Sequence, residues 1–210
     1  MSESFKTVTA IVLNIVLFIM EAAVMIPCFQ RENKHMFIYY TNDSNIFAGI
    51  TSLIYSVAAF TALFQGRAAV PEWIVMLRFM STLGLTLTYV IVVTALAPAY
   101  GKGGYAKLLF GKFSIFVHLI CPLIAFISFV FFEDGSCLSG ASALFIVMIP
   151  TLLYAVLSIL LNILKKWDGP YFFLKVYNQP VYVSMLWAVI VLGGAFLLGL
   201  CIRNLNLAMR

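Results

Sequence analysis

The chain has 210 residues, of which 63% are hydrophobic and only 10% charged, and its formal net charge is +5. Soluble domains carry roughly a quarter charged residues, so this composition excludes an ordinary water-soluble globular domain. The longest basic run is Lys165-Lys166, which favours anionic lipid headgroups over nucleic acid as the partner of the excess positive charge. We therefore predict an all-α polytopic membrane protein that contacts membrane lipids and binds no nucleic acid.

Six continuous apolar runs follow one another along the chain, and a bilayer-spanning helix needs about 20 apolar residues. They predict one domain over residues 1–210, a bundle of six transmembrane helices. The spans are expected at about 8–28, 38–64, 73–97, 112–132, 141–164 and 181–202. The first run contains Asn14 and Glu21, and no small-residue cleavage site follows it, so we expect a retained span and not a signal peptide.

The basic residues are distributed unevenly over the two sides of such a bundle. The side with the first, third and fifth connections, here called side A, holds Arg31, Lys34, Lys102, Lys107, Lys112, Lys165, Lys166 and Lys175. The side with both termini, side B, holds only Lys6, Arg67, Arg203 and Arg210. By the positive-inside rule, we predict a multi-pass membrane protein with both termini extracytoplasmic.

Polar residues from distant stretches fall at a similar depth when each span is measured at about 1.5 Å per residue. The layer that they form below side A comprises Glu21, Thr41, Asn42, Asp43, Asn45, Tyr89 and His118. Ionisable groups inside a membrane are costly unless they pair or face water. The layer therefore predicts a hydrated cavity that opens to side A, although Ser, Thr and Asn also hydrogen-bond helices together without further function.

Two residues of this layer form a candidate catalytic pair. A threonine hydroxyl becomes a nucleophile when a base takes its proton, and His118 is the only histidine within a predicted span at the depth of Thr41. Glu21 or Asp43 is the candidate carboxylate that would orient the imidazole. Glu21 could instead be neutral, and Asp43 could be only a helix N-cap.

Other polar and aromatic residues receive weaker assignments. Asn42, Asn45 and Tyr89 are candidate donors to an oxyanion, but their amides and hydroxyl serve equally well between helices. Arg78 is expected to reach the side B interface with its long side chain. Aromatic residues at span ends, Trp73, Trp167, Tyr171 and Tyr182, are expected to form an interfacial belt.

Two further features of the sequence bear on the site. Pro122 lacks an N–H group, so the carbonyl of His118 loses its usual helical partner and we expect a distortion of the helix there. The four cysteines show no CxxC spacing, so we predict neither a metal nor another cofactor.

Three stretches resemble motifs of a known family: IYYTNDSN at 38–45, HLICPLIAFISFVFFE at 118–133 and WDGPYFFL at 167–174. Together they resemble the androgen-induced-gene family of six-span membrane proteins and its bacterial relatives. The resemblance implies an integral membrane hydrolase that cleaves fatty acid esters of hydroxy fatty acids with a threonine and a histidine. By motif position, the family threonine falls on Thr41 and the family histidine on His118.

The leading hypothesis is therefore an intramembrane lipid ester hydrolase whose partner is a lipid or fatty acyl ester substrate. A second hypothesis is a small transporter or channel that uses Glu21 and His118 as relay groups. Against it, polar residues appear concentrated towards side A, with only Thr9, Asn14 and Arg78 towards side B. A third hypothesis is a non-catalytic membrane scaffold.

Overall fold

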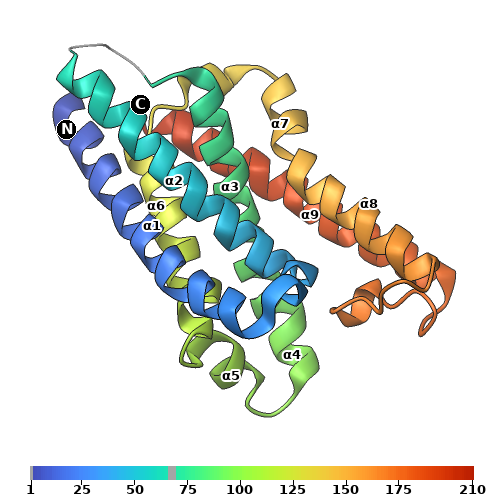
Figure 1. Ribbon diagram of the computed structural model, residues 1–210. Helices are drawn as coiled ribbons and strands as arrows, with labels where there is room; N and C mark the ends of the chain where they lie inside the picture. The colour runs from blue at the N-terminus through green and yellow to red at the C-terminus, as the bar shows by residue number, and fades with distance from the viewer. Residues whose placement is uncertain (1, 66–69) are drawn as a thin grey trace.

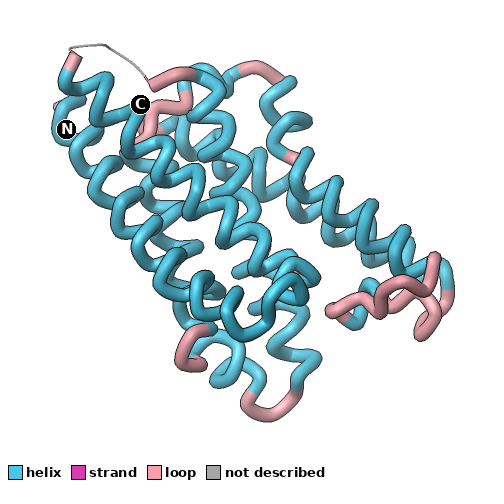
Figure 2. The backbone as a smooth tube through the Cα atoms, in the orientation of Figure 1, coloured by secondary structure: helices cyan, strands magenta, loops and turns pink. Residues whose placement is uncertain are grey.

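The computed structural model describes residues 2–65 and 70–210 of the chain, so Arg67 of the charge count lies outside the described residues. The described residues form helices and loops and no strand (Figures 1 and 2). The α-helices are α1 (Glu3–Glu32), α2 (Tyr40–Phe64), α3 (Glu72–Ile91), α4 (Ala97–Tyr100), α5 (Gly104–Phe110), α6 (Cys121–Phe132), α7 (Ser142–Val147), α8 (Ile149–Ile163) and α9 (Val181–Ala208). Short 3₁₀ turns lie at Asn33–Ile38, Ser136–Ser139 and Phe172–Leu174, and π-helical turns at Val92–Leu96 and Phe116–Ile120.

Among residues 2–65 and 70–210, five helical stretches are long and apolar enough to cross a membrane. They are Glu3–Ile38, Tyr40–Phe64, Glu72–Tyr100, Ser142–Ile163 and Val181–Ala208. The remaining predicted span corresponds to Phe116–Phe132, which is apolar but shorter. The prediction of an all-α polytopic membrane protein is confirmed, whereas the count of six spans stays a prediction.

Small residues let the helices of the bundle approach closely. A side chain at Gly49 of α2 would place its Cβ atom 3.1 Å from the Cβ atom of Glu21 in α1, which is tighter than ordinary contact. Ala48 of α2 is likewise fully buried, in one cluster with Leu17 of α1 and Leu85 of α3. The first three long helices therefore pack with their backbones near one another, with α6 beside them (Figure 1).

Helices α8 and α9 form a hairpin that projects from the side of this bundle (Figure 1). Ala195 and Ile202 of α9 attach it to the bundle, because they are buried in the cluster that contains Phe79 and Phe129. Helix α8 also contacts the bundle, since Thr151 bonds to the Tyr40 hydroxyl of α2. Most other α9 side chains are exposed or only partly buried in the isolated chain, as expected for a helix that faces lipid.

The two π-helical turns have a common local cause. Each precedes a proline: the Ala97 N–H before Pro98 donates to the Val92 carbonyl, and the Cys121 N–H before Pro122 donates to the Phe116 carbonyl, five residues back in both cases. A proline ring clashes with the carbonyl four residues earlier, and a wider turn relieves this clash. The distortion that we predicted beside His118 is therefore a π-helical turn.

Both chain termini lie at one end of the bundle (Figure 1), where the Lys6 ammonium donates to the Met209 carbonyl at 3.2 Å. The opposite end holds α4, α5 and the segment 164–180. The end with both termini is side B, and the opposite end is side A. Which of them faces the cytoplasm stays a prediction.

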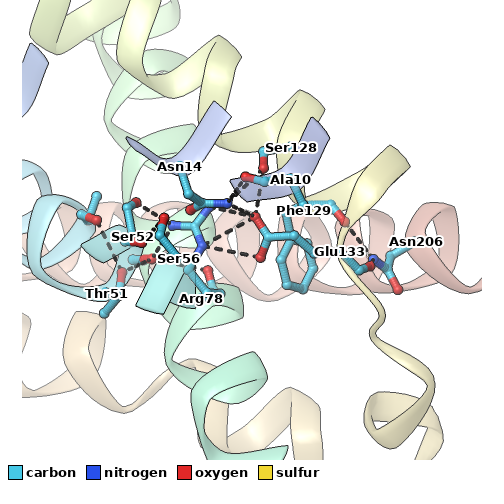
Figure 3. A network of polar contacts seen from close by, with 12 residues as sticks. Ala10, Asn14, Thr51, Ser52, Ser56, Arg78, Ser128, Phe129, Glu133 and Asn206 are labelled. Carbon is cyan, nitrogen blue, oxygen red and sulfur yellow. Dashed lines mark hydrogen bonds and ion pairs between the residues drawn. The ribbon is translucent and has the colours of Figure 1, made fainter. Parts of the chain in front are cut away.

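A buried ion pair occupies the side B half of the bundle (Figure 3). The Arg78 guanidinium of α3 lies 3.0 Å from the Glu133 carboxylate after α6, and neither side chain is exposed to solvent. The expectation that Arg78 extends to the interface was therefore wrong. The sequence places Glu133 in a loop. In the structure its carboxylate neutralises the Arg78 guanidinium inside the bundle, so the Arg78 side chain does not need to reach water.

Polar side chains from several helices complete this network. The Glu133 carboxylate accepts hydrogen bonds from Asn14 of α1 and Ser128 of α6, each at 2.8 Å. Arg78 donates to Ser52 of α2 at 3.1 Å and to Ser81 of α3 at 3.2 Å. Six polar residues thus join four helices near side B, whereas the sequence suggested that polar residues are concentrated towards side A.

Candidate functional site

A cavity of about 980 Å³ lies at the side A end of the bundle. It is enclosed by α1, the start of α2, α4 and α5, the π-helical turn Phe116–Ile120 and the segment 164–180. Its lining includes Thr41, Asn42, Tyr100, Ser114, His118 and Tyr171. We call it the Thr41 cavity. The structure thus brings together the two residues that the sequence analysis selected as a catalytic pair.

Thr41 lies in the first turn of α2, and its backbone is held on both sides. Its N–H group donates to the Tyr171 hydroxyl at 3.4 Å. Its carbonyl accepts hydrogen bonds from the Ser44 hydroxyl at 3.0 Å and from the Asn45 amide at 2.6 Å. Contacts with its own helix and with the segment 164–180 therefore fix the position of Thr41 at the cavity wall.

His118 lies within the π-helical turn that Pro122 induces, and its Nδ1 atom is 2.7 Å from the Leu108 carbonyl. A carbonyl oxygen only accepts hydrogen bonds, so we assign the proton of the neutral ring to Nδ1. The Nε2 atom is then an acceptor, the form that a general base requires. Among the described residues, no hydrogen bond joins His118 to Thr41, a common situation in catalytic sites without substrate.

The two candidate orienting carboxylates lie outside this cavity. Glu21 is 2% exposed, packs against Gly49, and has no hydrogen-bond partner for either carboxyl oxygen among the described residues. Asp43 lines a separate cavity between α2 and α8. The helix α2 begins at Tyr40, so Asp43 is not the N-cap that we had considered. In the structure the Leu108 carbonyl occupies the orienting position at His118.

The three candidate oxyanion donors take different positions. Asn42 lines the Thr41 cavity, although its amide also donates to the Met36 carbonyl at 2.9 Å. Asn45 is fully buried, and its amide joins the Thr41 carbonyl to the Val117 carbonyl, the latter at 3.4 Å. It therefore connects the helix of Thr41 to the turn of His118. Tyr89 is half-buried on α3 and does not line this cavity.

Tyr171 is a site residue that the sequence analysis assigned to an interfacial belt. It lines the Thr41 cavity, and its hydroxyl accepts a hydrogen bond from the Thr41 backbone N–H group. Burial raises the pKa of the Tyr171 hydroxyl, so it stays protonated and able to donate near neutral pH. Its place within the WDGPYFFL motif was the signal that could have identified it.

Within residues 2–65 and 70–210, no three His, Cys, Asp or Glu side chains gather closely enough to hold a metal ion. Comparison of the chain with protein-family models, with curated proteins and with solved structures gave no match. The relationship to the androgen-induced-gene family therefore stays a prediction from the three motifs.

Proposed function

We propose that this protein is an intramembrane lipid ester hydrolase in which Thr41 is the nucleophile and His118 the general base and acid. The observation that carries the proposal is the placement of both residues in the wall of one cavity, with the Nε2 atom of His118 available as an acceptor. The resemblance of the three sequence motifs to the androgen-induced-gene family supports the same pair. Fatty acid esters of hydroxy fatty acids are the substrates that this resemblance favours.

In the first step, the Thr41 hydroxyl oxygen attacks the ester carbonyl carbon while its proton passes to Nε2 of His118. The negative charge that develops on the carbonyl oxygen needs a donor within the cavity. The Tyr171 hydroxyl and the Asn42 amide line the same cavity and are our candidates. Protonated His118 then gives its proton to the departing alkoxide, which leaves as an alcohol.

In the second step, a water molecule attacks the acyl-threonine, and its proton passes to His118. The ester bond to Thr41 breaks, the carboxylic acid is released, and the Thr41 oxygen takes back its proton. Val24, Met25 and Leu96 give the cavity apolar walls that suit an acyl chain. The Lys107 ammonium at the same cavity suits the carboxylate product.

The test is to incubate the full-length detergent-purified protein with a fluorophosphonate probe and to locate the adduct by mass spectrometry. We expect one adduct on Thr41, retained in Thr41→Ser and absent from Thr41→Val, which keeps the side-chain shape. His118→Ala should lower the labelling rate by at least about 10³-fold, because the two residues act as a unit. A folded wild-type protein without an adduct, or a Thr41→Val variant that labels normally, contradicts the proposal.

A further inference from the structure

A second cavity, of about 360 Å³, lies between α2, α3 and α8. We call it the Asp43 cavity. Its lining includes Phe37, Tyr40, Phe47, Tyr154 and Trp167, together with a single charged residue, Asp43. Thr41 and His118 do not line it, so the proposed hydrolase chemistry leaves its composition without a role.

The aromatic rings of this cavity form walls that meet at steep angles. The rings of Tyr40 and Tyr154 lie 5.1 Å apart at 63°, and those of Tyr154 and Trp167 lie 6.4 Å apart at 85°. The Tyr154 hydroxyl donates to the Ile38 carbonyl at 2.8 Å, and the Tyr40 hydroxyl bonds to Thr151 at 2.8 Å. These contacts hold the two tyrosine rings in place before any ligand binds.

In the part of the chain that the structure describes, no cation neutralises the Asp43 carboxylate. None of the ion pairs between the described residues includes its carboxylate, and no Lys, Arg or His lines the cavity. Asp43 is half-buried in the first turn of α2, and a carboxylate beside apolar walls is stabilised when a cation lies next to it. Two further polar atoms, Oγ of Ser158 and Nε1 of Trp167, are buried in the wall and lack a hydrogen-bond partner among the described residues.

The chemistry of the wall favours one class of cation. A metal ion would need several oxygen ligands, but the cavity offers one carboxylate and a few hydroxyl groups. A primary ammonium would need acceptors for three N–H groups. A quaternary ammonium has no N–H group, is attracted to aromatic faces and is the usual ligand of aromatic cages.

We propose that the Asp43 cavity is a binding site for a quaternary ammonium group of the trimethylammonium type, held by the Asp43 carboxylate and by the faces of the surrounding aromatic rings. The volume of the cavity is near the lower end of the range for small-molecule pockets, which suits a headgroup alone. It lies at the side A end, between the start of α2 and Trp167. A choline headgroup of a phospholipid and a free quaternary ammonium solute present the same chemistry there.

The test uses the full-length protein in a nonionic detergent, with binding of radiolabelled choline measured by equilibrium dialysis. We expect saturable binding, and binding of the neutral isostere 3,3-dimethylbutan-1-ol that is at least about ten-fold weaker. Asp43→Asn should weaken choline binding by at least about ten-fold. Asp134→Asn, which removes an aspartate from the side B loop, should leave it unchanged.

Two variants locate the site. Tyr154→Leu removes a wall ring and should weaken binding, whereas Tyr154→Phe keeps the ring and should bind choline nearly as well. Thermal unfolding of each variant separates a loss of binding from a loss of folding. If Tyr154→Leu does not fold, the near-isosteric variant Asp43→Asn tests whether choline binding depends on this cavity. Three results would each overturn the proposal. They are choline binding that is unchanged in Asp43→Asn, equal binding of choline and its neutral isostere, and the absence of binding of both choline and phosphatidylcholine.

Nanodiscs distinguish the two sources of the ligand. If the natural ligand is a lipid headgroup, free choline should bind in phosphatidylglycerol discs but be displaced in phosphatidylcholine discs. If it is a soluble solute, the affinity for free choline should be the same in both. Each of these two results supports a quaternary ammonium site in the Asp43 cavity. Fluorophosphonate labelling of Thr41 tests the hydrolase proposal separately.

Discussion

The Thr41 cavity and the Arg78–Glu133 network are both built from polar residues inside a membrane bundle, yet they are opposite in character. The network is closed: Arg78, Glu133 and Asn14 are all fully buried, and the two charges satisfy one another with help from neighbouring amide and hydroxyl groups. The Thr41 cavity is open, and Nε2 of His118 has no hydrogen-bond partner among the described residues. What distinguishes the candidate site from the network is therefore an unused acceptor that faces a cavity.

The largest effect on stability is expected when one charge of the Arg78–Glu133 ion pair is removed. Glu133→Gln should lower the free energy of unfolding by about 3–5 kcal/mol, because it leaves the Arg78 charge buried without a counter-ion. The measurement is chemical or thermal unfolding in detergent.

The matched control is the double variant Arg78→Met with Glu133→Gln, which removes both charges. It should regain most of the lost stability, since replacing a buried ion pair by neutral groups is often nearly neutral. If the single variant is as stable as the wild type, the pair does not hold the bundle together in the way that we infer.

An intermediate effect is expected at Tyr171. Tyr171→Phe should slow fluorophosphonate labelling of Thr41 by about 100-fold, the usual cost of removing one donor to an oxyanion, with little change in the unfolding temperature. Tyr177→Phe, in the same segment, is the control, because its hydroxyl donates to the Ile163 carbonyl and does not line the cavity. Equal labelling rates of the two variants would remove Tyr171 from the site.

The smallest effect compares two buried asparagines whose amide N–H groups each bridge two backbone carbonyls. The Asn45 amide joins the Thr41 and Val117 carbonyls, and the Asn206 amide joins the Phe129 and Glu133 carbonyls. Replacing either by Ala should cost about 1 kcal/mol of stability for each hydrogen bond lost. Only Asn45→Ala should also slow the labelling of Thr41, by about ten-fold, because it loosens α2 from the turn of His118. A similar loss in both variants would show that Asn45 acts on stability alone.

The sequence alone was sufficient for the fold class and for placing Thr41 and His118 at the same end of the bundle, where they line one cavity. Apolar runs long enough to cross a bilayer leave the chain little alternative to helices, because every backbone polar group in lipid must be satisfied within the segment. The rise per residue along a helix then converts chain position into depth. Depth was enough to place Thr41 and His118 in the same layer.

Depth contains no information about direction around the helix axis or about which helices are neighbours. Asp43 is only two residues after Thr41, but about 200° around α2, and the structure places it in a different cavity. Glu133 follows the end of α6, where the sequence suggests a loop, and only the packing of α1, α3 and α6 brings it to Arg78. Tyr171 reaches Thr41 because the segment 164–180 folds back over the bundle, and its contact spans 130 positions along the chain.

The physical reason for this division is the range of the forces involved. Hydrophobicity and backbone hydrogen bonding act on each segment by itself, and the composition of the chain therefore determined its helices and its membrane environment. Hydrogen bonds and ion pairs depend on distances of a few ångströms between segments far apart in the chain. Only the tertiary structure decided which polar groups satisfy one another and which are left facing a cavity.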